Sequence, residues 1–147
     1  MLIVVLATLV ATVLSVGIHD QLFKLLATRL PGLRFLARQR VMIGIVGAIV
    51  AHTLEIAVFA GAMAALDWLP AGWDVGQLQS TEAHNWADYV YWSAVCYTTM
   101  GFEHATPVGA IRLLVGVEAL VGLVLVAWTA SFTYFQMEKF WSERGRK

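Results

Sequence analysis

The chain has 147 residues, of which 59% are hydrophobic and 14% are charged, and its formal net charge is zero. Soluble domains carry about 25% charged residues, so this composition, with a mean hydropathy of +0.71, argues against a disordered chain or a nucleic-acid-binding domain. It indicates an integral membrane protein of one domain. The single cysteine, Cys96, excludes an intrachain disulfide and any multi-cysteine metal site.

Residues 1–18 form the first apolar run and contain no charged side chain. As a helix this run spans about 27 Å, which is just enough for a hydrocarbon core of about 30 Å. A signal peptide is the alternative, and it would have a basic start and a small-residue cleavage site. No Lys or Arg precedes Lys24 and no obvious Ala-x-Ala site follows, so we expect a retained N-terminal transmembrane helix.

Residues 19–40 contain five cations, and leucines recur there at spacings of three and four residues. This pattern predicts an amphipathic segment on the cytoplasmic surface of the membrane. The segment is expected to break at Pro31–Gly32, because proline does not continue a helix. A partly ordered linker is the alternative.

Two more long apolar runs, an outer one at 41–66 and an inner one at 108–137, can each span a bilayer with some tilt. The polar stretch 67–85 contains no Lys or Arg and is expected to be an external loop. Residues 86–97 are apolar and aromatic but too few to span, which favours a re-entrant helix. Residues 138–147 form a charged tail.

The cations predict the topology. Nine of the ten Lys and Arg residues lie within 24–40 and 139–147, and Arg112 is the exception. The positive-inside rule places both groups in the cytoplasm. Residues 67–107 then face outside and dip back without crossing. We therefore expect a multi-pass protein of the cell membrane with its N-terminus outside and its C-terminus in the cytoplasm.

The stretch from Asp88 onward reads DYVYWSAVCYTTMGFEHATP. It resembles the pore loop of the tetrameric potassium channel superfamily, whose filter reads Thr-Thr-Val-Gly-Tyr-Gly-Asp. The first five filter positions correspond here to Thr98, Thr99, Met100, Gly101 and Phe102. The resemblance implies a pore domain at 41–137 and a fold of three transmembrane helices with a re-entrant pore helix at 86–97 and a filter at 98–103. It also implies a homotetramer, because each chain supplies a quarter of a filter.

The filter chemistry expected from this resemblance uses backbone oxygens. Rings of carbonyls replace the hydration shell of a permeating cation, and Gly101 can adopt the positive φ that turns carbonyls toward an axis. The Thr99 carbonyl and hydroxyl would add the inner cation ligands. We therefore expect monovalent cations to bind at Thr99 and Gly101.

Two positions depart from the family pattern: Glu103 stands where the family has its second filter Gly, and His104 where it has Asp. Four Glu103 carboxylates around one mouth would attract cations, divalents included, and weaken potassium selectivity. The alternatives are a strictly potassium-selective pore, or a Glu103 that points sideways and pairs with His104 or Arg112. His104 at the outer mouth can confer pH sensitivity, or it can be an ordinary solvated histidine.

Arg112 lies near the start of the inner apolar run, and three further ionisable residues lie well inside the long runs: His52, Glu55 and Glu118. Intramembrane ionisable groups are costly and usually face protein or water. One hypothesis is a hydrogen-bonded brace from the outer helix to the back of the pore loop, tuned by protonation, and the alternative is simple adhesion between helices. A metal site is disfavoured because no third ligand has a required spacing. Phe132 is the candidate inner gate.

These features predict an all-α membrane protein that conducts potassium passively, together with sodium or divalent cations where selectivity is weakened. We expect no chemical cofactor, no enzymatic activity, no nucleic acid and no small-molecule substrate. The expected partners are three further copies of the chain and the lipid bilayer. The alternatives are an accessory or structural membrane protein, or a small intramembrane enzyme that uses His52, Glu55, His84 and His104.

Overall fold

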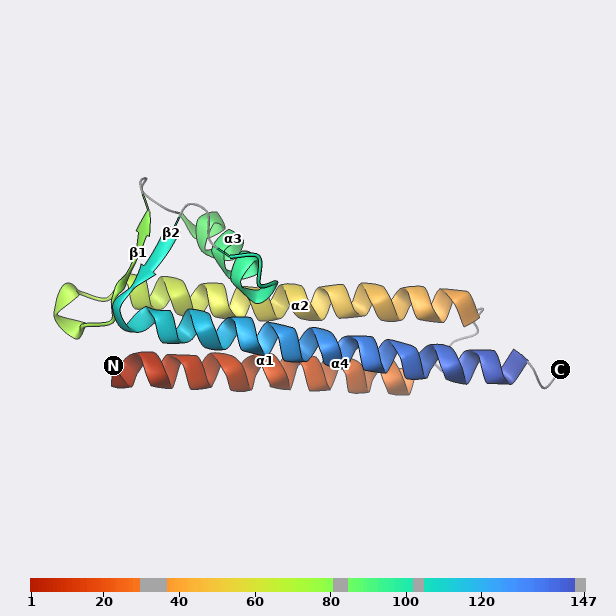
Figure 1. Cartoon of the computed structure of the whole chain (residues 1–147). Helices are drawn as coiled ribbons and strands as arrows, with labels where there is room; N and C mark the ends of the chain where they lie inside the picture. Colours follow the sequence, from red (N-terminus) through yellow and green to blue (C-terminus); the bar gives the residue numbers. More distant parts are fainter. Residues whose placement is uncertain (30–36, 81–84, 102–104, 145–147) are drawn as a thin grey trace.

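The computed structural model describes residues 1–29, 37–80, 85–101 and 105–144. Three long helices lie side by side in it: α1 (Leu2–Arg29), α2 (Ala37–Asp67) and α4 (Arg112–Arg144) (Figure 1). The described chain contains three helical stretches long and apolar enough to cross a membrane, one in each of these helices. The predicted all-α membrane fold is confirmed.

The three helices are held together along narrow faces, and most of their apolar surface is left for lipid. At most a third of each candidate span is buried inside the chain. Small residues at helix contacts let the backbones approach closely. In lipid, where no hydrophobic effect acts between helices, this close packing drives their association. On α1 the buried residues recur every three or four positions and form one stripe: Val4, Thr8, Ala11, Ser15, His19 and Phe23.

The first helix differs from the sequence-based boundaries. Residues 19–29 continue α1 as regular helix, so the expected change of segment after residue 18 is not seen in the structure. On the exposed side, Lys24 and Asp20 form an i,i+4 ion pair of 2.6 Å that suits a helix continuing toward water. The predicted break at Pro31–Gly32 lies outside the described residues.

The short helix α3 (Trp86–Tyr97) has the bounds predicted for the re-entrant helix. It runs obliquely from the end of the bundle that contains the N-terminus toward the middle of α2 (Figure 1). A 3-10 turn, Gly109–Ile111, precedes α4, so regular α-helix starts later than predicted. The core lies where α3 meets the long helices, and its largest fully buried apolar members are Tyr89, Phe59, Met63, Ile111 and Leu114.

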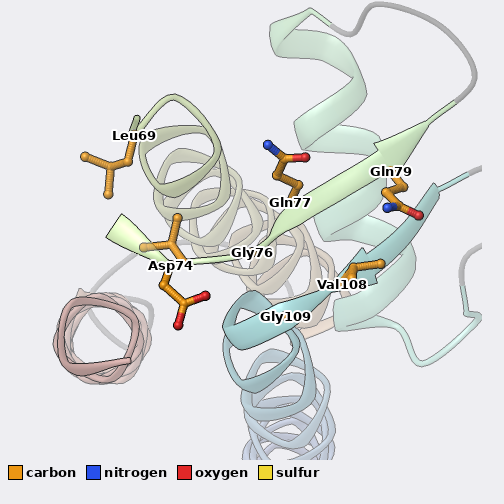
Figure 2. Close-up of a pocket in the computed structure, with 8 residues that line it drawn as sticks. Leu69, Asp74, Gly76, Gln77, Gln79, Val108 and Gly109 are labelled. Atoms are coloured by element: carbon orange, nitrogen blue, oxygen red, sulfur yellow. The ribbon is translucent and has the colours of Figure 1, made fainter. Parts of the chain in front are cut away.

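Two strands flank α3 in sequence, and the sequence analysis did not predict them. β1 (Gln77–Ser80) pairs antiparallel with β2 (Ala105–Val108), with Gln77 opposite Val108. Gly76 and Gly109 both have positive φ where the strands leave the bundle, and a Cβ on Gly109 would lie 2.7 Å from the Gly76 Cα. Figure 2 shows the two glycines side by side at an open cavity of about 290 Å³. The two ends of the segment between α2 and α4 are thereby held together.

Candidate functional site

The N-terminal end of α3 is fixed by a cap and by a contact with α2. Asn85 caps the helix by accepting from the Ala87 N–H at 2.7 Å, while Asp88 accepts from the Asn85 N–H at 2.7 Å. The Tyr89 hydroxyl donates to Asp67 Oδ2 at 2.7 Å. Burial and the neighbouring Asp67 carboxylate raise the pKa of Tyr89, so this phenol stays neutral and keeps donating.

The C-terminal end of α3 forms a Schellman motif. The Thr99 N–H bonds to the Cys96 carbonyl and the Met100 N–H bonds to the Val95 carbonyl, both at 2.9 Å. Thr99 has φ 60 and Gly101 has φ 87, so the positive φ expected for Gly101 is confirmed. A β-branched residue with positive φ is a conformational outlier. Such strain gathers at functional sites, which favours Thr99 as one.

The segment after α3 is uncovered in a single chain. Thr98, Thr99, Met100 and Gly101 are all exposed, and Met100 has 81% of its surface free. This non-helical backbone begins beside His52, midway along α2. At membrane depth such backbone occurs only where it is buried in protein or lines a water-filled cavity. Phe102, Glu103 and His104 lie outside the described residues.

Gly122 sets how closely α4 approaches this segment. A Cβ at Gly122 would lie 2.2 Å from the carbonyl oxygen of Tyr97, the last residue of α3. Only glycine therefore allows the helices to touch there. At Gly116, six residues earlier on the same helix, no described atom lies within 4 Å of an added Cβ. Within one chain Gly122 is a close-packing position.

Glu118 lies against the middle of α3. Its side chain is fully buried, and Oε1 is 2.5 Å from Ser93 Oγ, which is also 2.8 Å from the Ile56 carbonyl oxygen. A hydroxyl has a single proton to donate. The Ser93 hydroxyl therefore shares its one proton between the Glu118 carboxyl group and the Ile56 carbonyl oxygen. The pair links α2, α3 and α4.

A second buried cluster is centred on Glu55 of α2. Its Oε2 accepts from the Tyr97 hydroxyl and lies 3.0 Å from His52 Nδ1, while Oε1 lies 2.9 Å from His19 Nδ1 on α1. His52 Nε2 is 2.9 Å from Thr129 Oγ1 on α4. The cluster therefore connects all four α-helices at the last residue of α3. The structure places His52 and Glu55 against the last residue of α3, and their role as a brace stays a prediction.

A family model described as "Ion channel" (Ion_trans_2) matches residues 41–138, more than half of the chain. The chain belongs to this ion-channel family. The match includes α3, the segment after it and most of α4, and it leaves out α1. No curated protein and no solved structure matches the chain. The predicted family is thus confirmed, and α1 lies outside the part of the chain that the family model matches.

The sequence analysis missed several partners in this ion-channel chain: His19, Tyr97, Ser93 and Thr129 all bond to the predicted residues. One signal could have found His19. It lies four residues after Ser15 and four before Phe23, so it continues the periodic stripe of the first apolar run past residue 18.

Phe132, the candidate gate, has a packing contact within the channel chain. Its ring meets Phe23 of α1 edge to face with centroids 4.6 Å apart. The ring is half-buried beside Ala48 and Ala51 of α2. Its gating role stays a prediction, while Phe135, one turn further on, is 66% exposed.

Proposed function

We propose that the chain is one subunit of a four-fold pore that conducts monovalent cations, potassium above all, passively across the cell membrane. The observation that carries the proposal is the exposed backbone from Thr98 to Gly101, which follows a buried short helix in a member of an ion-channel family. Residues 98–103 form the filter in this proposal, and the cations bind at Thr99 and Gly101. Carbonyl rings of this kind replace the water that a cation sheds.

The same exposure supports a homotetramer. One chain contributes one filter segment, and a closed ring of carbonyls needs four. Copies of the chain around a common axis would cover the non-helical backbone that lipid cannot solvate. On α4 a stripe of exposed residues is available to face the axis or a neighbouring subunit: Leu113, Gly116, Leu120, Leu123, Ala127 and Ser131.

The proposed orientation places the N-terminus outside and the C-terminus in the cytoplasm. Lys24 and Arg29 lie near the end of α1, at the opposite end of the bundle from the loop that contains Asp74 and from the first turn of α3, which contains Asp88 (Figure 1). The positive-inside rule makes the cationic end cytoplasmic. Passive conduction needs neither a chemical cofactor nor catalysis, and we expect none.

Reconstitution into liposomes under bi-ionic gradients of potassium, sodium and calcium tests the function, with Gly101→Ala as the decisive variant. Gly101 has φ 87, a conformation that costs an L-residue about 1–2 kcal/mol, and each pore contains four copies. We expect cation flux to fall below detection while the tetramer persists. Gly17→Ala is the matched control, because no described atom lies within 4 Å of a Cβ there. A verified wild-type tetramer without flux under any gradient would refute the proposal.

Glu103→Gln tests the acidic ring. Removing four carboxylates from one mouth should weaken block by calcium and raise the preference for potassium over sodium, because acidic rings concentrate cations, divalents above all. Reversal potentials and calcium block in planar bilayers measure both effects. Asp74→Asn, which removes a different exposed external acid, should change neither. Identical currents in wild type and Glu103→Gln would exclude the ring.

A further inference from the structure

Three metal-ligating side chains converge beside the last residue of α3. His19 from α1 and His52 and Glu55 from α2 each offer one ligand atom, and these atoms all lie within 4.8 Å of one another. The spacing along the sequence showed only two of them. We propose that His19, His52 and Glu55 form a binding site for a transition-metal ion of the Zn²⁺ class.

The donor set suits zinc. Two imidazoles and one carboxylate are three of the ligands that zinc prefers, and a tetrahedral site with bonds of about 2.0 Å separates neighbouring ligand atoms by about 3.3 Å. The two histidine Nδ1 atoms lie 2.9 and 3.0 Å from separate oxygens of Glu55. A small adjustment therefore admits an ion between them.

The hydrogen bond of His52 fits metal binding, whereas His19 is held by ring stacking alone. A ligating Nδ1 must be unprotonated, so the ring proton lies on Nε2 and needs a partner. His52 Nε2 has one in Thr129 Oγ1 at 2.9 Å. His19 Nε2 is buried and has no hydrogen-bond partner among the described residues, and the ring stacks on Phe23 at a centroid distance of 4.3 Å. Both rings are thus held with Nδ1 directed at Glu55.

A fourth ligand position lies toward Tyr97. Its hydroxyl is 2.9 Å from His52 Nδ1 and bonds to Glu55. The hydroxyl borders the position of the fourth ligand. A metal-bound water or the phenol oxygen itself can occupy this position and complete the tetrahedral coordination. His52 keeps 18% of its side chain exposed, whereas His19 and Glu55 are fully enclosed, so an ion reaches the cluster past His52.

The site discriminates against the hard cations that a cation pore conducts. Ca²⁺ takes six to eight oxygen ligands and Mg²⁺ an octahedral oxygen shell, whereas this cluster offers one carboxylate and two nitrogens. Imidazole nitrogen favours zinc, copper and nickel. A bound ion would fasten α1 to α2 next to the end of the pore helix. The effect of the bound ion on cation flux rests on the proposed function, but the binding of the ion to the cluster does not.

The test measures binding without flux. The purified full chain is stripped with EDTA and titrated with Co²⁺, which reports tetrahedral nitrogen and oxygen ligation by visible absorption, and Zn²⁺ is then added in competition. We expect one metal ion per chain and a Zn²⁺-dependent rise in the unfolding temperature. His19→Asn keeps an N–H near the position of Nδ1 but lacks the imidazole, and it should abolish the tetrahedral spectrum.

Two further variants keep the test decisive if His19→Asn does not fold. Thr129→Val removes only the partner of His52 Nε2 and should weaken binding about 10–100-fold. The double variant His84→Ala, His104→Ala removes the histidines outside the cluster and should bind like wild type. No tetrahedral Co²⁺ spectrum in the wild type, or a spectrum lost in the double variant and kept in Thr129→Val with unchanged affinity, would overturn the site.

Discussion

Glu55→Ala should be among the most damaging single substitutions in this chain, with an expected loss of about 3–5 kcal/mol in the free energy of unfolding. The carboxylate is fully buried and receives contacts from three helices through His19, His52 and Tyr97. Removing it leaves the buried His19 Nδ1 without its partner, and an unsatisfied buried group costs about 1–3 kcal/mol. His52 Nδ1 and the Tyr97 hydroxyl keep only each other. The tie between Glu55 of α2 and the last residue of α3 is also lost.

The single cysteine provides the measurement. Cys96 is buried, at 5% exposure, one residue before Tyr97, so the rate at which a thiol reagent labels it reports opening around the end of α3. We expect labelling to accelerate in Glu55→Ala and cation flux to fall. EDTA is kept present so that no bound metal contributes. Glu138→Ala removes an exposed acid of α4 and should leave both unchanged. If Cys96 were labelled in Glu55→Ala at the same rate as in the wild type, the cluster would not support α3.

The sequence predicted the elements that are set by local patterns. Trp86–Tyr97 has the predicted bounds because an apolar run ends at polar residues on both sides, with Asn85 as a cap. The three spans follow from run length and composition. The positive φ of Gly101 follows from the freedom of glycine and from the family resemblance.

The features that the sequence did not reveal depend on contacts between distant residues. His19 joins the Glu55 cluster only because α1 continues past residue 18 and packs beside α2. The pairing of β1 with β2 joins segments on either side of α3 and depends on the close approach of Gly76 and Gly109. Periodicity can place His19 on the packed face of α1, but it does not identify Glu55 as the partner of His19, and the pairing of β1 with β2 has no periodic signature. The metal-ligand set was incomplete because its third member comes from a distant helix.

Gly122→Ala should uncouple the pore helix from α4. The added Cβ would lie 2.2 Å from the Tyr97 carbonyl oxygen and 2.9 Å from its carbonyl carbon. Neither atom can move without moving the end of α3, because both belong to the backbone. Overpacking of this kind costs about 1–3 kcal/mol, although alanine favours a helix more than glycine does. A loss of stability in Gly122→Ala therefore cannot come from the helix propensity of α4.

The displacement reaches the proposed filter directly, because Thr98 and Thr99 follow Tyr97 and hydrogen-bond back to Ala94 and Cys96. We expect flux to fall at least about tenfold, which corresponds to about 1.4 kcal/mol, and Cys96 labelling to accelerate. Gly17→Ala, at a position open to lipid, should behave like wild type. Gly122→Ala could instead reduce flux and leave the rate of Cys96 labelling unchanged. That result would show that Gly122 allows α4 to bend and is not needed for close packing. In that case Gly116→Ala, where an added Cβ meets no described atom within 4 Å, shows whether the bend extends along the helix.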